Sequence, residues 1–188
     1  IYNESKIVYN SKSDDFTKYG VEFNGKMAVV EKIINLEYLW NKVRVVGGAY
    51  GCGCYFKRNG IFALYSYRDP NVAATYEAYE NIADFLEMFQ ADNKQMLKFI
   101  IGAISDKDRP VHNSSMANIS ITRFFSGTTI KSLQKERDEL LSTTVEDIHA
   151  FAKLFKSINS TDYICTIGNK TAIEAADKIF EQIKPLDR

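Results

Sequence analysis

Arg44 and Tyr50 are the residues of this chain whose types and spacing best suit chemistry. An arginine offers five fixed N–H donors for carbonyl or carboxylate oxygens, and a tyrosine hydroxyl can donate to an oxygen that gains negative charge. Together these side chains could stabilise a tetrahedral intermediate. The residues alone leave an alternative open, in which Arg44 is a solvated cation at a helix end and Tyr50 is a core aromatic of a strand.

A cluster of glycines surrounds this pair. Gly47, Gly48, Gly51 and Gly53 lie close together, although each costs about 0.5–1 kcal/mol relative to alanine inside a helix or strand. Such a cluster indicates a bulge, a positive φ, or a ligand whose main chain runs alongside. It follows a predicted helix and precedes a predicted strand, which is the reverse of the order in phosphate-binding loops. A phosphate site is therefore not expected.

Other chemical groups are scattered. His112 and His149 lie in different segments and form no H-E-x-x-H or H-x-x-E-H motif, and Cys52 and Cys54 lack the paired spacing of structural zinc sites. No G-x-S-x-G occurs, and Cys165 has no base nearby in the sequence. We expect no metal site in this chain. Cys52 and Cys54 are expected to point to one side of a strand, and His149 to lie on a helix.

Composition is typical of one well-cored domain, which we assign to residues 1–188. The chain has 188 residues, 45% of them hydrophobic, and 24 basic residues balance 24 acidic ones, so we expect no nucleic-acid partner. The longest apolar stretches are far shorter than the roughly 20 residues that span a bilayer, so we expect no membrane association. Three cysteines, an odd number, favour a reducing compartment. We expect the cytoplasm, with an organelle matrix as the alternative.

The first half of the chain predicts a strand, a helix and a hairpin. Residues 6–10 have the character of a strand, and the polar stretch 11–18 is typical of a loop. From Met27 to Val43, apolar residues recur at helical spacing, which predicts one helix or a broken pair. Asn59-Gly60 separates two apolar and aromatic runs, 52–56 and 61–67, and predicts a β-hairpin.

The second half predicts mainly helices. Asp69-Pro70 predicts a helix start with Asp69 as the N-cap, and the pair Thr143 and Glu146 predicts a capping box. Further helices are expected from about residue 93 to 104, over 130–141 and over 172–183, and a buried strand over 163–167. This order indicates an α+β fold in which helices cover one face of a sheet.

The segment Tyr38-Leu-Trp-Asn-Lys-Val-Arg-Val-Val-Gly-Gly-Ala-Tyr-Gly51, with Ser66-Tyr-Arg-Asp-Pro-Asn71, resembles a known family. It is similar to the last domain of the presequence-protease branch of the pitrilysin/insulinase zinc metallopeptidases. Residues 24–27, 101–104 and 137–143 also resemble that branch, and the similarity is weakest over 109–127. The resemblance implies a mixed or antiparallel sheet covered by helices on one face, as in the pitrilysin/insulinase-type peptidase domain.

The resemblance also implies an enzyme of two halves that close around unfolded peptides. Zinc, with its inverted histidine motif, would be in an N-terminal half that this chain does not contain, and the chain itself would hold no cofactor. Arg44 would bind a peptide carbonyl, and Tyr50 would hydrogen-bond the scissile carbonyl as it becomes an oxyanion. Gly47 and Gly48 would leave room for the peptide backbone. Cys52 and Cys54 depart from the family pattern, in which small or aromatic residues are more common at these positions.

These points predict the C-terminal domain of a zinc metalloendopeptidase that degrades short or unfolded peptides. The domain would bind substrate and stabilise the transition state, and the isolated chain would be inactive. Its partners would be the N-terminal half of the same polypeptide and peptide substrates. One alternative is a non-catalytic structural relative of the same fold, and another is a peptide-binding module that uses the hairpin edge by strand addition. The substrate, the oligomeric state and the completeness of the first element stay open.

Overall fold

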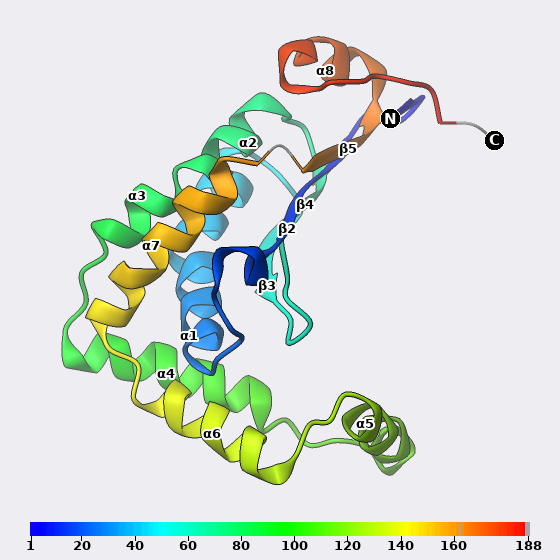
Figure 1. The fold of residues 1–188 in the computed structure, drawn as a ribbon. Helices are drawn as coiled ribbons and strands as arrows, with labels where there is room; N and C mark the ends of the chain where they lie inside the picture. Colours follow the sequence, from blue (N-terminus) through cyan, green and yellow to red (C-terminus); the bar gives the residue numbers. More distant parts are fainter. Residues whose placement is uncertain (162, 187–188) are drawn as a thin grey trace.

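A five-stranded mixed sheet organises the fold (Figure 1). The structure is a computed structural model that describes residues 1–161 and 163–186. The strands lie in the order β1-β5-β2-β4-β3, and every neighbouring pair is antiparallel except β1 and β5, which are parallel. Their bounds are β1 (Tyr2–Asn3), β2 (Val8–Asp15), β3 (Gly51–Phe56), β4 (Ile61–Asp69) and β5 (Ile164–Asn169). The predicted fold class, an α+β arrangement with a mixed sheet, is confirmed.

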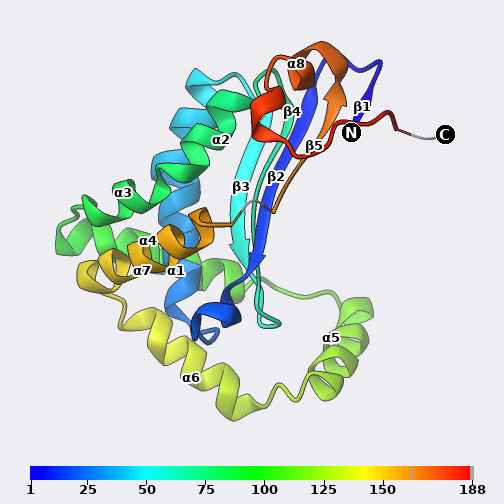
Figure 2. The same ribbon diagram turned by 45° about the horizontal axis from the view of Figure 1, so that its top comes forward.

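Helices cover one face of the sheet, and the other face is open (Figures 1 and 2). The covering elements are α1 (Lys26–Ile33), η2 (Ile34–Val46), α2 (Ala73–Glu80), α3 (Ile82–Glu87) and α7 (Val145–Asn159). On β4, Phe62 and Leu64 are fully buried beneath them, whereas Tyr65 and Tyr67 alternate with these residues and are exposed. The Phe62 ring meets the Phe155 ring of α7 edge-on, with centroids 5.2 Å apart. Strand alternation thus separates a core face from an aromatic outer face.

Two further helices, α4 (Asn93–Lys107) and α6 (Ile130–Leu141), pack against α1. Glu136 of α6 accepts two hydrogen bonds from the Arg58 guanidinium, at 2.7 and 2.6 Å. Burial alone would raise the pKa of Glu136, but this bidentate pairing outweighs it and lowers the pKa below its ordinary value. The remaining short elements are η1 (Phe16–Tyr19), α8 (Lys170–Glu174) and η3 (Asp177–Ile179).

Helix α5 (Asn113–Phe125) stands apart from the other elements in both views (Figures 1 and 2). It buries none of its own side chains, and Phe124 and Phe125 at its end are more than four-fifths exposed. Sequence reasoning did not predict this helix. None of the described helices is both long enough and apolar enough to cross a bilayer.

The predicted long helix and the hairpin are both confirmed. Helix α1 continues into η2 without a break, because Ile34 keeps right-handed helical φ and ψ where the winding changes. The hairpin joins β3 to β4 through Asn59-Gly60, and Gly60 has a φ of 91°, which glycine adopts without strain.

The predicted loop over 11–18 is wrong for most of its length. Strand β2 extends through Asp15 and lies in the middle of the sheet, between β5 and β4. Its inward side chains Asn10, Lys12 and Asp14 are polar and nevertheless buried. Asn10 donates to Ser66 Oγ at 3.1 Å, and hydrogen bonds of this kind offset the cost of burying polar groups. A hydrophobicity pattern cannot show such pairing.

The predicted helix start at Asp69 is wrong. Asp69 is the last residue of β4, and α2 begins at Ala73. The Asp69 carboxylate is fully buried and accepts four hydrogen bonds. The donors are Ser66 Oγ at 2.6 Å, Thr75 Oγ1 at 2.8 Å, Asn71 N at 2.9 Å and Asn10 Nδ2 at 3.1 Å. Asp69 therefore ties β2, β4 and α2 together instead of capping a helix.

Two other boundaries differ from the prediction. The N-cap of α7 is Thr144, whose hydroxyl accepts from Asp147 N at 3.3 Å, whereas Thr143 is buried and donates to Leu140 O at 2.9 Å. The predicted helix over 172–183 is reduced to α8 and η3. Beyond it the chain runs beside β1, where Tyr2 N donates to Lys184 O at 3.0 Å, and this pairing holds the segment extended.

Candidate functional site

The end of the long helix positions Arg44. Element η2 is wound as a π-helix, and its last turn closes with a hydrogen bond of 3.1 Å from Gly47 N to Lys42 O, five residues back. Winding of this kind is rare and is often found at functional sites. It places the Arg44 guanidinium carbon 4.0 Å from the centre of the Trp40 ring, in a cation–π contact. Within residues 1–161 and 163–186 the guanidinium has no hydrogen-bond or ion-pair partner.

Tyr50 lies just before β3 and is exposed by 61%, so the alternative of a core aromatic is wrong. Its ring centroid is 5.6 Å from that of Tyr67. The Arg68 guanidinium carbon also lies 5.6 Å from the centre of the Tyr50 ring. The Tyr50 backbone N–H donates to Arg68 O at 3.3 Å. Among the described residues the Tyr50 hydroxyl has no hydrogen-bond partner, so it is available to a ligand.

The local backbone gives Gly47 and Gly48 a structural reason of their own. A Cβ on Gly47 would lie 2.5 Å from Val43 O, and Gly48 has a φ of 80°. These two residues end the helix and turn the chain toward β3. Whether they also make room for a peptide stays a prediction, and the open space beside Gly48, where a Cβ would meet only Pro70 at 3.5 Å, agrees with it.

Gly51 and Gly53 provide room for two tyrosines of β4. A Cβ on Gly51 would lie 2.2 Å from the Tyr67 ring, and one on Gly53 would lie 2.7 Å from the Tyr65 hydroxyl. Each tyrosine is thus laid across β3 on the open face of the sheet. Because Tyr67 also contacts Tyr50, Gly51 helps to determine where the Tyr50 ring can lie.

A hydrogen-bonded turn ties the segment 44–50 to the end of β4. The Asn71 side chain donates from Nδ2 to Gly47 O at 2.5 Å, and the Asn71 backbone N–H donates to the buried Asp69. Asp69 is therefore connected through Asn71 to Gly47 O, the carbonyl at the end of the helix. Its neighbour Arg68 accepts the Tyr50 backbone N–H, which connects the same turn to Tyr50. All four predicted site residues lie on this one segment, where β3 begins and β4 ends.

Apolar side chains on η2 lie exposed beside the site. Val45 is exposed by 63% and Val46 by 81%, and Leu36 and Trp40 are close to half exposed. Exposed apolar groups next to polar groups without partners are typical of surfaces that bind another chain.

The cysteines and histidines form no site in the described part of the chain. As predicted, Cys52 and Cys54 point to one side of β3. The structure shows that this is the helix-covered side, where Cys52 Sγ donates to Leu39 O at 3.3 Å. Burial raises the pKa of Cys52 to about 11, which makes it a poor nucleophile. His149 on α7 contacts Phe89 O at 2.7 Å. Nowhere in residues 1–161 and 163–186 do three His, Cys, Asp or Glu side chains converge as metal ligands would.

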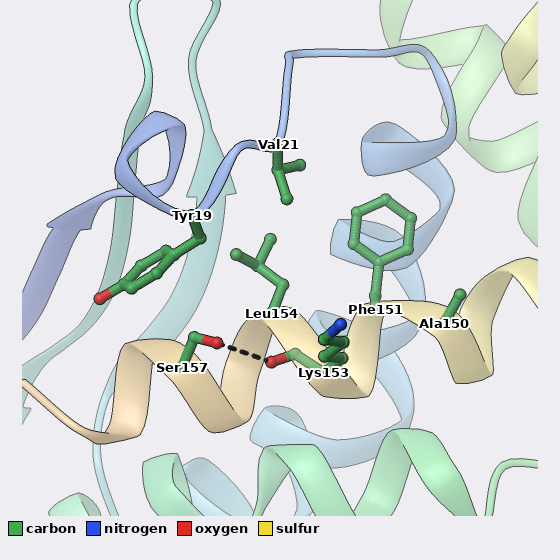
Figure 3. Close-up of a pocket in the computed structure, with 7 residues that line it drawn as sticks. All are labelled: Tyr19, Val21, Ala150, Phe151, Lys153, Leu154 and Ser157. Atoms are coloured by element: carbon green, nitrogen blue, oxygen red, sulfur yellow. Dashed lines mark hydrogen bonds between the residues drawn. The ribbon is translucent and has the colours of Figure 1, made fainter.

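The helical side also carries a shallow apolar hollow of about 260 Å³ (Figure 3). Val21 and Leu154 point toward each other across it, and Phe151 closes one side. Its one hydrogen bond between lining residues, from Ser157 Oγ to Lys153 O, lies within α7. Tyr19, Lys153 and Ser157 are its polar lining residues, and none of the predicted site residues lines it.

Sequence reasoning missed Tyr67 and Arg68 as parts of the site. Both lie in the Ser66–Asn71 segment, whose sequence resembles the family but carries no motif that marks either residue. Strand alternation places Tyr67 on the open face, but the contact of Arg68 with Tyr50 depends on the turn between β4 and α2.

The site occurs in a sequence that matches a known family. The family model described as "PreP C-terminal domain" matches residues 4–170. The chain belongs to this family. This presequence-protease C-terminal domain is 39% identical over 184 residues to "Protein HypA" of Clostridium perfringens, covering 98% of the chain and 19% of that protein. It is 32% identical over 174 residues to "Presequence protease 1, chloroplastic/mitochondrial" of Arabidopsis thaliana, covering 92% of the chain and 16% of that protein.

Solved structures share the fold of the domain. A protease from Helicobacter pylori superposes with a TM-score of 0.60 at 14% identity, over 89% of the chain and 42% of that structure. The peptidase M16 inactive domain from Pseudomonas fluorescens superposes with a TM-score of 0.59 at 13% identity, over 90% of the chain and 43% of that structure. Pitrilysin superposes with a TM-score of 0.54 at 12% identity, over 88% of the chain and 19% of that structure. The predicted family is confirmed, and the domain spans less than a fifth of the length of the two relatives named above.

Proposed function

We propose that this domain supplies half of the active site of a zinc metalloendopeptidase that degrades short or unfolded peptides. One observation carries the proposal. Arg44 and Tyr50 lie on a single short segment, and the polar ends of both side chains lack partners within the described residues. The segment itself is fixed by Asn71 and by the end of β4. Donors held in place before the substrate arrives are what electrostatic stabilisation of a transition state requires.

In this proposal the two side chains have separate roles. The Arg44 guanidinium, held against Trp40, donates to a backbone carbonyl of the peptide and so fixes its register. The Tyr50 hydroxyl donates to the scissile carbonyl oxygen as that oxygen becomes negative. Gly48, beside open space, leaves room for the main chain of the peptide, and Gly47 ends the helix so that the chain can turn there. A zinc ion, when bound, polarises the carbonyl and activates water.

The described residues of this chain do not fit a zinc ion, because no set of ligands converges. We therefore assign the ion to an N-terminal half of the same polypeptide, which would close over the segment 44–50. The exposed Val45 and Val46 suit such a contact. For the compartment we keep the cytoplasm, with an organelle matrix as the alternative, since plant and fly relatives carry chloroplastic or mitochondrial names.

A peptidase assay on an unfolded, quenched fluorescent peptide tests the proposal. The polypeptide that carries both halves should cleave the peptide and lose this activity to a zinc chelator, and residues 1–188 alone should not cleave it. Arg44→Ala in the two-half polypeptide should raise KM at least tenfold, because it removes a contact made with substrate in both the ground state and the transition state.

Arg123→Ala is the matched control. This arginine is exposed on α5, far along the chain from the site. Its replacement should leave kcat and KM unchanged. If the two-half polypeptide cleaves nothing, the domain is a structural relative without catalytic function. If residues 1–188 alone bind the peptide at micromolar concentration without any other half, strand addition at the hairpin edge is the better account.

A further inference from the structure

We infer that Arg68 is a positioning residue that holds the Tyr50 ring in its reactive orientation. This inference rests on the proposed function of Tyr50 and adds a residue to it. Arg68 combines a strained backbone, a side-chain contact with Tyr50 and a guanidinium that has no competing partner in the described residues.

The backbone of Arg68 is strained. Its φ is 49°, and it is the one residue other than glycine with a positive φ in residues 1–161 and 163–186. An L-residue with a Cβ avoids this region, and glycine enters it freely. The chain does use glycine where it needs a positive φ elsewhere, at Gly48 and Gly60 for example. An arginine kept in this conformation therefore points to a role for its side chain.

The surrounding structure holds Arg68 in place. The next residue is the buried Asp69, whose four hydrogen bonds fix the end of β4. On the other side, Arg68 O accepts the Tyr50 backbone N–H at 3.3 Å. The left-handed turn thus brings the carbonyl and the side chain of Arg68 to the same neighbour, Tyr50.

The side chain makes a single defined contact. Its guanidinium carbon lies 5.6 Å from the centre of the Tyr50 ring, and no described residue offers it a hydrogen bond or an ion pair. Tyr67 contacts the same ring, also at 5.6 Å. Two contacts on one exposed ring restrict its rotation and leave the hydroxyl unobstructed. Arg68 acts through Tyr50 in this arrangement and does not itself touch the reacting atoms.

Two substitutions separate the side chain from the strain. Arg68→Ala and Arg68→Gly both remove the guanidinium, but only glycine relieves the positive φ. In the two-half polypeptide both substitutions should lower kcat on the order of tenfold with KM nearly unchanged, because the Tyr50 hydroxyl loses its orientation. The melting temperature of Arg68→Gly should exceed that of Arg68→Ala by about 2–4 °C. Arg123→Ala should leave kcat, KM and the melting temperature unchanged.

Combination with Tyr50→Phe gives the decisive result. If Arg68 acts through the Tyr50 hydroxyl, Arg68→Ala should lower kcat no further in the Tyr50→Phe background. An equal loss in both backgrounds would overturn the inference, as would wild-type kcat in Arg68→Gly. If Tyr50→Phe itself keeps full activity, the proposed function fails, and the inference fails with it. If only the Arg68 variants are fully active, the proposed function stands and the inference alone is wrong.

Discussion

Replacing Asp69 with asparagine should weaken the fold more than any exposed acidic substitution. The buried carboxylate accepts from Ser66 Oγ, Thr75 Oγ1, Asn71 N and Asn10 Nδ2 at 2.6–3.1 Å. Asparagine keeps the shape but has one acceptor oxygen, and its NH₂ group would face donors. Three of the four bonds end on Oδ2 and one on Oδ1, so an amide oxygen at the Oδ2 position leaves one donor, Asn71 N, without its acceptor. Loss of that bond costs about 1.5 kcal/mol, and the three bonds that remain lose a charged acceptor at about 0.5 kcal/mol each, so the free energy of unfolding should fall by about 3 kcal/mol.

Urea unfolding followed by circular dichroism measures this change directly. For a domain of this size, about 3 kcal/mol corresponds to a loss of roughly 6–12 °C in melting temperature. Asp138→Asn is the matched control, because Asp138 is exposed on α6 and its side chain accepts a hydrogen bond from Gln134, and its effect should stay within about 0.5 kcal/mol. A similarly small effect of Asp69→Asn would refute the claim that this carboxylate anchors the turn.

Two further predictions concern pH and thiol reactivity. The pKa of Glu136 is lowered from its ordinary value of 4.5, so its pairing with Arg58 stabilises the fold above that pH and is lost as the pH falls through the folded-state pKa. Glu136→Gln should therefore reduce the fall in unfolding free energy below about pH 4.5 in urea titrations; an unchanged pH profile would contradict this. Iodoacetamide at pH 8, followed by mass spectrometry, should label the exposed Cys165 well before Cys52, whose pKa is raised to about 11, and Cys54, which is buried; equal rates would show that β3 opens in solution.

The sequence predicted those parts of the fold that depend on local patterns. Helical spacing of apolar residues identified the long helix up to Val43, and Asn59-Gly60 identified the hairpin. Both signals arise within a few residues along the chain, so no knowledge of the tertiary structure is needed. Arg44 and Tyr50 came from the family resemblance, because the residues alone left them open as a surface cation and a core aromatic.

The errors lie where distant polar residues meet. Strand β2 looks like a loop because its buried side chains are polar, and they are tolerated only through partners such as Ser66 on β4. Asp69 looks like an N-cap because the same carboxylate chemistry serves helix starts and buried anchors. The contact between Arg68 and Tyr50 depends on a left-handed turn that no spacing rule predicts in an arginine.

The kcat of Tyr50→Phe in the polypeptide that carries both halves tests the central claim most directly. This substitution removes one hydroxyl from an exposed ring and leaves its contacts with Tyr67 and Arg68 in place, so the fold should be unaffected. Loss of one oxyanion donor costs about 10²–10³ in turnover, and we predict a fall in that range with an unchanged melting temperature. A kcat within about threefold of the wild-type value would contradict the role of Tyr50 in stabilising the transition state.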